Sequence, residues 1–336
     1  MTTTTPIAGV SVRRMTPEAL PDVVRIDEAT TGRPRPRFHR KRVISLDQDD
    51  RDIALVAERD GQTVGFAFTR VFEGELGMAA PVGVLDWIGV DPPQRGAGVG
   101  RILLDATVDE LDRRGVHQMR TQAAWNEHNL VEFFAANGFQ LAPRIAIDRP
   151  VDLPLDDEFQ SRVPPLATLD EDAWVEPDRA LEVDFAPEVP PDVVLVRSLE
   201  ESDLEDVVQL DRLATGQNRV EYYQRMVEEA LHLTGIRLSL VAELEGRLVG
   251  VMMVRADYGE FGKVESGAVL DTVVVEPGLE GRHVARAMLG QLLGNLKSLC
   301  VDVLRTEVAW DDVALVRFFA HNGFTHAQRL SFVREL

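Results

Sequence analysis

Cysteine is almost absent from this sequence, since Cys300 is the only one among 336 residues. One cysteine cannot close an intramolecular disulfide, and no cluster of cysteine and histidine has the spacing of a zinc site. We therefore expect neither a disulfide-stabilised fold nor a bound metal, and we interpret Cys300 as a buried packing residue.

Basic residues are scarce relative to acidic ones, with 36 Lys and Arg against 56 Asp and Glu and a formal net charge of −20. Binding to nucleic acid needs concentrated Lys and Arg, so we expect no nucleic-acid partner. An acidic protein can attract a cationic substrate, but the same charge also serves solubility.

Long apolar runs are missing as well. No run of about eighteen apolar residues is present to span a membrane, and residues 1–6 lack the basic-then-apolar pattern of a secretory signal. We therefore expect a cytoplasmic protein with no membrane partner, either a monomer or a homodimer.

The chain contains a long internal repeat. A constant offset of 185 residues aligns the two halves from about residue 56 to residue 139. The clearest match joins residues 130–139, LVEFFAANGF, to residues 315–324, LVRFFAHNGF. Nearer the start the offset is 184, which places Asp27 on Asp211. Because solenoid repeats are only about 20 to 50 residues long, this period indicates duplicated domains.

We predict two domains of one kind, residues 8–150 and 192–336, joined by an acidic, proline-rich linker over residues 151–191. Residues 170–174 of this linker are the part that could instead dock on a domain. Within each copy the pattern predicts a helix, two strands, a buried strand, a helix, a strand, a helix and a strand. The expected fold class is α/β, with a mixed sheet in each of two tandem domains.

The most informative segment is residues 94–101, Gln-Arg-Gly-Ala-Gly-Val-Gly-Arg, between a predicted strand over 84–90 and a predicted helix over 101–113. Alternate glycines allow backbone N–H groups to converge on a phosphate at the positive end of a helix. No Gly-Lys-Ser/Thr follows, which excludes a P-loop, and Leu103 stands where a Rossmann fingerprint has its third glycine. The alternative is an ordinary glycine-rich turn.

This loop, its preceding strand and the later Phe-Phe-x-x-Asn-Gly-Phe segment together resemble the GNAT superfamily of acyltransferases. The resemblance covers both halves and implies two tandem GNAT-like domains with acetyl-CoA as the acyl donor. It implies that the loop binds the pyrophosphate of acetyl-CoA, through Arg95, Gly96, Ala97, Gly98, Val99, Gly100 and Arg101. It also implies that the strand lies beside the pantetheine arm, at Ile88, Gly89 and Val90.

Two further roles follow from the resemblance. The backbone N–H of Val90 would polarise the thioester carbonyl. Asn129, together with Asn126, is a candidate contact for the pantetheine, the alternative being a cap at the start of the next helix.

The second copy departs from the family pattern, because residues 279–285 read Leu-Glu-Gly-Arg-His-Val-Ala. His283 replaces the central glycine and would crowd a phosphate, while Glu280 replaces Arg95 and would repel it. We interpret this copy as a non-catalytic partner, as in tandem family members with one competent half. The alternative is that Arg282 and His283 provide a different phosphate contact.

Acetyl transfer to an amine needs a group that removes a proton, because an alkylamine has a pKa of about 10. We predict Asp86 as this base, with Glu58 and Glu127 as weaker candidates. The alternative for Asp86, which recurs as Asp271, is a hydrogen-bonding role at a bend of the strand. Many family members place a tyrosine as general acid where this chain has Phe134, which implies another acid or protonation by solvent.

The leading functional hypothesis is an N-acetyltransferase that moves the acetyl group of acetyl-CoA to an amine of a small molecule. Asp27 would lie near the acceptor entrance, unless its Thr-Gly neighbours are only a helix stop. The arginine-rich run over residues 33–42 could bind an anionic group or form a solvated loop. The alternative functions are a non-catalytic acyl-CoA sensor or scaffold and a protein-lysine acetyltransferase.

Overall fold

The computed structural model describes residues 9–32, 39, 52–72, 80–155, 194–228, 231, 238–257, 261, 266–279 and 281–336. The predicted linker beyond residue 155, with its docking segment 170–174, lies outside the described residues, as does the arginine-rich run apart from His39. The chain forms two compact units, one made of Met1–Leu153, Arg255–Thr272 and Cys300–Leu336 and the other of Pro154–Val254 and Val273–Leu299. The domain boundaries at 8–150 and 192–336 stay a prediction.

The first half of the chain alternates strands and helices. Its strands are β1 (Val10–Arg14), β2 (Asp52–Arg59), β3 (Gln62–Phe72), β4 (Val82–Val90), β5 (Gln118–Ala124), β6 (Gln140–Leu141) and β7 (Arg144–Pro150). Its helices are η1 (Pro17–Ala19), α1 (Leu20–Thr31), η2 (Pro92–Gln94), α3 (Val99–Arg113) and α4 (His128–Ala136). The predicted order is found, with two short strands added, β1 before the first helix and β6 before the last strand.

The second half repeats this order. Its strands are β8 (Leu195–Ser198), β9 (Leu240–Leu244), β10 (Arg247–Asp257), β11 (Gly267–Val275), β12 (Val303–Ala309), β13 (Thr325–His326) and β14 (Arg329–Glu335). Its helices are η4 (Glu201–Asp203), α5 (Leu204–Thr215), α6 (Val220–Glu228), α7 (Val284–Ser298) and α8 (Val313–His321). The predicted α/β class with mixed sheets is therefore confirmed.

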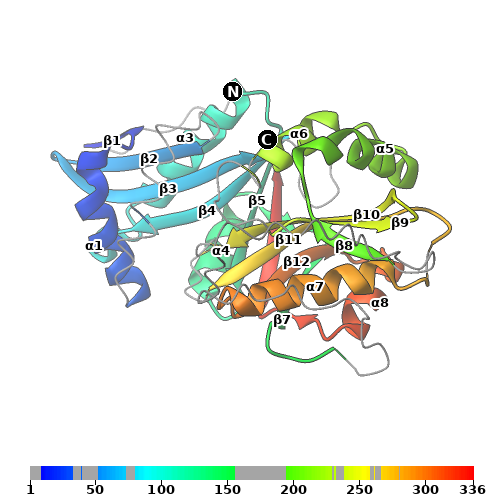
Figure 1. Ribbon diagram of the computed structural model, residues 1–336. Helices are drawn as coiled ribbons and strands as arrows, with labels where there is room; N and C mark the ends of the chain where they lie inside the picture. Colours follow the sequence, from blue (N-terminus) through cyan, green and yellow to red (C-terminus); the bar gives the residue numbers. More distant parts are fainter. Residues whose placement is uncertain are drawn as a thin grey trace, which may run out of the picture. The chain divides into compact units, whose positions relative to one another are not determined.

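Two seven-stranded sheets carry the fold (Figure 1), in the orders β1-β2-β3-β4-β5-β14-β6 and β13-β7-β12-β11-β10-β9-β8. The pairs β4–β5 and β11–β12 are parallel. A parallel pair needs a crossover connection, and α3 and α7 provide these. The parallel pair and its helix thus recur in both halves.

The last strand of each half lies in the sheet of the other half. Strand β14 pairs antiparallel with β5 over its full length, from Arg329↔Ala124 to Glu335↔Gln118. Strand β7 pairs in the same way with β12, from Val303↔Pro150 to Ala309↔Arg144. The sequence repeat predicts two similar sheets and gives no sign of this exchange.

Alternate residues of β2 face two different cores of the first sheet. Leu55 and Ala57 pack in the core beneath α3, whereas Ala54 and Val56 pack in the core beneath α1. This alternation is expected of a strand buried on both faces, because successive side chains point to opposite sides. Helices α1 and α3 therefore cover opposite faces of the sheet.

A repeated glycine lets the crossover helix pack closely in each half. A Cβ at Gly65 would lie 3.0 Å from Leu103 Cδ1 and 3.1 Å from Val99 Cγ1 of α3. A Cβ at Gly250 would lie 2.8 Å from Met288 Cε of α7. The recurring Val-Gly pair therefore marks the point of closest approach between strand and helix.

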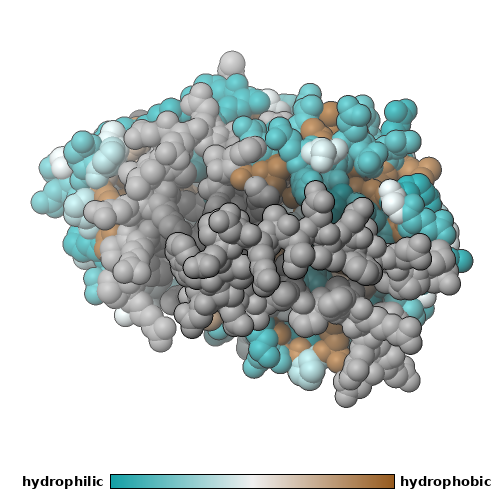
Figure 2. All heavy atoms as spheres, viewed as in Figure 1, coloured by the Kyte–Doolittle hydropathy of each residue, from teal (hydrophilic) through white to brown (hydrophobic). Residues whose placement is uncertain are grey.

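Large hydrophobic side chains are exposed at several described positions, among them Trp125, Leu141 and Trp310. On the face seen in Figure 2 the coloured residues are predominantly hydrophilic, with small hydrophobic patches. Within the described ranges no helix is long and apolar enough to cross a membrane, and no three His, Cys, Asp or Glu side chains group as a metal site.

The interpretation of Cys300 as buried is wrong, because this residue is exposed in the turn after α7.

The exchanged strand contributes a large side chain to the core beneath α3. Phe332 of β14 is 3% exposed, and its ring centroid lies 5.6 Å from that of Phe134. Phe134 in turn contacts Phe139, with 5.2 Å between ring centroids. The core of the first sheet is therefore completed by the C-terminal strand.

We predict that Phe332→Ala lowers the free energy of unfolding by about 3–5 kcal/mol, because it leaves a cavity in this core. Urea unfolding followed by fluorescence and circular dichroism measures the effect. Val313→Ala, at a side chain that is 61% exposed, is the control and should change stability by no more than about 0.5 kcal/mol. A loss below about 1 kcal/mol for Phe332→Ala would contradict the exchange of β14.

Candidate active site

The loop after β4 turns directly into helix α3. The Asp91 N–H donates to Val64 O at 2.9 Å, and the short helix η2 follows. Gly96 and Gly98 then adopt left-handed φ angles of 78° and 80°, with Gly98 as the N-cap of α3. The first intrahelical bond joins the Ile102 N–H to Gly98 O at 3.1 Å. The N–H groups of the first turn therefore point out of the helix end, where an anion can bind.

The other glycines of this region are required by close contacts. A Cβ at Gly100 would lie 3.2 Å from Phe133 Cε2 and 3.6 Å from Val90 Cγ2. A Cβ at Gly89 would lie 2.6 Å from Phe66 Cε1. Gly100 therefore lets α3 begin against α4 and the end of β4, and Gly89 leaves room for an aromatic ring.

Hydrogen bonds fix the loop to α1. Arg95 Nη2 donates to Thr30 Oγ1 at 3.1 Å, and Arg95 Nε donates to Val90 O at 3.3 Å. Arg25 of α1 pairs with Asp91 at 2.8 Å. Arg101, by contrast, has a side chain that is 76% exposed beside the helix start. The structure thus brings all seven predicted loop residues to one helix end.

Strands β4 and β5 separate beyond their first residues. Their parallel register covers only Gly83↔Met119 and Val84↔Arg120. The antiparallel register of β4 with β3, however, continues to Gly65↔Val90. Among the described residues, positions 86–90 of β4 thus have no strand partner on the β5 side. Ile88, Gly89 and Val90 lie on this open edge, which leads to the helix end of the loop.

Asp86 lies at the point where the strands begin to separate. The β3–β4 register shifts between Phe68↔Trp87 and Thr69↔Leu85, so Asp86 is the extra residue of a β-bulge. The residue is 5% exposed. A bulge changes the direction of a side chain and bends the strand. It therefore accounts for both the position of Asp86 and the separation of β4 from β5.

Its counterpart in the second copy, Asp271, forms an ion pair with Arg255 at 3.0 Å. The position equivalent to Arg255 in the first copy is Arg70, which pairs with Asp52 at 3.4 Å. A basic residue at the equivalent position of β3 or β10 thus forms an ion pair in each copy.

The weaker base candidates have structural partners. Glu58 accepts two hydrogen bonds from Arg13, at 3.0 and 2.6 Å. Glu127 is the N-cap of α4 and accepts from the Ala124 N–H at 2.9 Å. Asn129, in the first turn of α4, is exposed. Phe134 is 1% exposed within the core, so this position offers no acid to a bound substrate.

The repeated aspartates near the start of each copy are buried. Asp27 is fully buried and lies 2.8 Å from His39 Nε2. Asp211 accepts from Arg219 Nε at 2.9 Å and from the Tyr223 hydroxyl at 3.0 Å. Both carboxylates thus anchor polar groups inside the fold, which favours a structural role over contact with an acceptor. The offset of 184 residues that aligns the aspartates also places His39 on Tyr223, so the partner position recurs although the residue type differs.

Glu307 is a buried charged residue that sequence reasoning missed. It accepts hydrogen bonds from Arg120, Gln122 and Ser331, and Arg144 Nε lies 3.8 Å away. Burial acts to raise the pKa of Glu307, but the charges of Arg120 and Arg144 and these hydrogen bonds hold it below the ordinary value. Glu307 is therefore an ionised carboxylate inside the first unit.

The second loop keeps the backbone of the first with a different side chain. His283 is the N-cap of α7 and has a φ of 63°, and Gly281 has a φ of 78°. These values match those of Gly98 and Gly96. His283 thus stands at the position of the helix-end glycine, in a conformation that disfavours a side chain. Glu280 lies outside the described residues.

We predict that His283→Gly raises the free energy of unfolding by about 1 kcal/mol, because glycine removes the left-handed strain. Thermal and urea unfolding measure the change. His283→Ala is the matched control, since alanine at the same φ keeps the strain and should give no gain. A gain of equal size in both variants would show that loss of the imidazole, and not release of the strain, is responsible.

Comparison with known sequences identifies the same segments. The family model described as Acetyltransferase (GNAT) family matches residues 20–139 and again residues 204–324. The mycothiol acetyltransferase of Thermobispora bispora is 36% identical over 85 residues, which is 25% of this chain and 29% of that protein. The enzyme of the same name from a Nocardioides species is 31% identical over 100 residues, 28% of this chain and 34% of that protein. The matched part is thus about a third or less of these curated relatives.

Solved structures share the fold over almost the whole chain. A GCN5-related N-acetyltransferase from Sphaerobacter thermophilus has a TM-score of 0.62 at 17% identity, covering 99% of this chain and 97% of that one. A tandem GNAT protein from the clavulanic acid biosynthesis pathway has a TM-score of 0.60 at 17% identity, covering 97% and 98%. With the family model matching most of both halves, the chain belongs to the acetyltransferase (GNAT) family.

Proposed function

We propose that this protein is an acetyl-CoA-dependent N-acetyltransferase that acetylates an amine of a small molecule at its first copy. The observation that carries the proposal is the continuous path from the open edge of β4 to the glycine-lined N-terminus of α3. Family membership supports it, as does the partial similarity to enzymes named mycothiol acetyltransferase. The choice of acceptor, a cytoplasmic location and a monomeric or homodimeric state are parts of the proposal that rest on the sequence.

The residues of the first copy fit the pyrophosphate, the pantetheine arm and the thioester of acetyl-CoA. Backbone N–H groups at the start of α3, with Arg95 and Arg101 nearby, would hold the pyrophosphate. The backbone of residues 88–90 at the open edge would form hydrogen bonds with the amide groups of the pantetheine arm, as it would with a neighbouring strand. The Val90 N–H would then polarise the thioester carbonyl.

Transfer needs one proton to leave the acceptor amine. Asp86 would accept this proton while the amine nitrogen forms a bond to the acetyl carbon and the carbon–sulfur bond breaks. The departing thiolate would be protonated by solvent, since Phe134 replaces the tyrosine of many family members. In the second copy His283 fills the helix end, so we propose that this copy does not catalyse transfer.

We expect Gly98→Glu to abolish acetyl-CoA binding to the first copy, because it adds both left-handed strain and a negative charge at the phosphate position. Isothermal titration calorimetry measures binding, and thiol release with a mixed amine panel measures turnover. His283→Glu is the matched control, because the same side chain enters the equivalent position of the second loop and should leave both readouts unchanged.

Each outcome of this experiment is informative. Binding without acceptor-dependent thiol release in the wild type would favour the acyl-CoA sensor over the enzyme. Loss of binding in His283→Glu but not in Gly98→Glu would assign the cofactor to the second copy and contradict the proposal.

For Asp86→Asn we expect kcat to fall by about 10²- to 10⁴-fold, because the amide cannot accept the proton. Binding of acetyl-CoA should stay at the wild-type level, and Asp86→Glu should recover part of the rate. If Asp86→Asn keeps the wild-type kcat, or if both variants lose cofactor binding, Asp86 is a structural residue of the bulge.

A further inference from the structure

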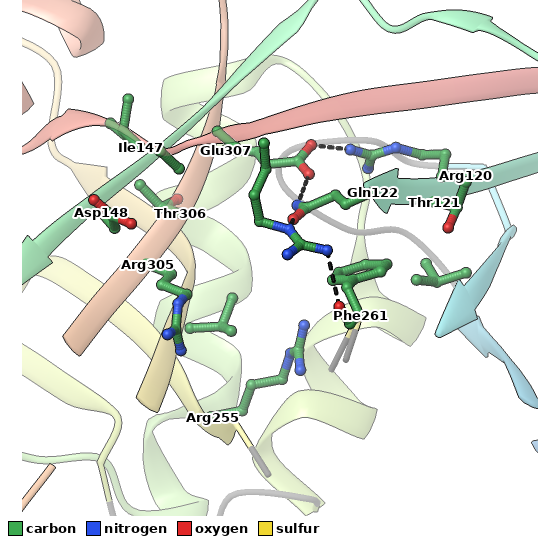
Figure 3. Close-up of a pocket in the computed structure, with 15 residues that line it drawn as sticks. Arg120, Thr121, Gln122, Ile147, Asp148, Arg255, Phe261, Arg305, Thr306 and Glu307 are labelled. Atoms are coloured by element: carbon green, nitrogen blue, oxygen red, sulfur yellow. Dashed lines mark hydrogen bonds and ion pairs between the residues drawn. The ribbon is translucent and has the colours of Figure 1, made fainter. Parts of the chain in front are cut away.

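A small cavity lined by arginines lies inside the first unit (Figure 3). Its volume is about 50 Å³, and its walls come largely from β5, β12 and β7. The charged side chains that line it are Arg120, Arg255, Arg305, Arg329, Asp148 and Glu307. Figure 3 shows Arg120, Arg255 and Arg305 arranged around this space. None of these residues belongs to the cofactor loop.

The cavity contains more positive than negative charge. Four guanidinium groups and two carboxylates line it, and the carboxylate of Glu307 already binds Arg120. Ion pairs also join lining residues to groups outside the lining, among them Glu307 to Arg144 and Arg255 to Asp271. Among the described lining residues four cations thus accompany two anions, inside a protein whose net charge is −20.

A buried excess of arginine favours a bound anion. Arginine stays protonated in proteins, so the excess charge cannot be lost by titration. Arg329 Nε donates to Gln122 Oε1 at 3.2 Å, and Arg329 Nη2 donates to Phe261 O at 2.8 Å. Guanidinium groups recognise carboxylates and other oxyanions through paired, charge-assisted hydrogen bonds.

The size of the cavity limits the ligand. One water molecule needs roughly 10–15 Å³ of cavity volume measured in this way. The cavity therefore holds a few waters or one small oxyanion group. A nucleotide or a pantetheine chain is too large. The group that fits is a carboxylate or a tetrahedral oxyanion.

The cavity lies next to the point at which β4 and β5 separate. Val84 and Arg120, the last paired residues of these strands, both line it. Asp86 lies two residues further along β4, or roughly 6–7 Å at the usual rise of a strand. An anion in the cavity would therefore lie near the candidate base.

We propose that this arginine-lined cavity is an oxyanion site that holds the carboxylate of the acceptor, so that the substrate is an amine carrying a carboxylate. This identification rests on the proposed function, whereas the binding of an oxyanion in the cavity does not. Arg305 and Arg329, both from the second half of the chain, supply two of its guanidinium groups. The second copy therefore contributes to substrate choice at the first.

The first experiment uses sodium sulfate as the probe, titrated by calorimetry at constant ionic strength set with chloride. Arg305→Gln should weaken sulfate binding by roughly 10- to 100-fold, the effect of losing one charged hydrogen-bonding group. Arg317→Gln, an exposed arginine on α8, is the matched control and should bind as the wild type. Sulfate can also bind at the helix end of the cofactor loop, so Gly98→Glu should lose that site but keep the sulfate binding that Arg305→Gln weakens, which separates the cavity from the loop.

Folding of each variant is checked by its thermal transition without sulfate. If Arg305→Gln does not fold, Arg329→Gln replaces it with the same expectation. Absence of sulfate binding in the wild type, or equal binding in the arginine variants, overturns the oxyanion site. Loss of all sulfate binding in Gly98→Glu does the same, because it assigns the sulfate to the loop.

The second experiment identifies the source of the oxyanion. Acetyl transfer is measured for ω-amino acids from glycine to 6-aminohexanoate, each compared with its uncharged amide. We expect a carboxylate to be preferred, and Arg305→Gln to lower kcat/KM for that acid but not for its amide. Sulfate binding without any preference for acids overturns the assignment to the acceptor and leaves a free anion as the ligand. Failure of acetyl-CoA binding, by contrast, refutes the proposed function and leaves the sulfate result standing.

Discussion

The early separation of β4 from β5 is the constraint on which the candidate site depends. Parallel pairing stops at Val84↔Arg120, and the bulge at Asp86 follows at once. A strand with one open edge exposes backbone hydrogen-bonding groups that sheet formation would otherwise consume. The same separation aims β4 at the start of α3 and borders the arginine-lined cavity. The open edge of β4, Asp86 and the arginine-lined cavity therefore lie close together because these two strands separate.

Strand exchange explains why a second copy with an altered loop still matters to the first. Strand β14 pairs with β5 along its whole length, and Phe332 completes the core beneath α3. Glu307 of the second half binds Arg120 and Gln122 of the first half. Removing the second half would therefore expose the edge of β5 and leave Arg120 without this carboxylate. Its structural contribution is independent of whether its own loop binds a cofactor.

The two loops show how one backbone serves different chemistry. Gly98 and His283 have almost the same left-handed conformation at the start of equivalent helices. Glycine adopts this conformation without strain and adds no side chain at the helix end, whereas histidine places an imidazole on the N-cap residue. The altered side chain thus leaves the backbone of the loop unchanged, at the cost of local backbone strain.

Local patterns in the sequence determined the elements, the duplication, the glycine loop and the family, because strand alternation, helix periodicity and glycine spacing are short-range signals. Tertiary structure alone decided the exchange of β7 and β14, the bulge at Asp86 and the cluster around Glu307. Arg120 and Glu307 are 187 residues apart, and no local pattern encodes which distant strand a segment will pair with. The same limit applies to Cys300, whose exposure depends on what packs against its turn. The loop could thus be predicted from its own residues, whereas the cavity beside it needed the whole fold.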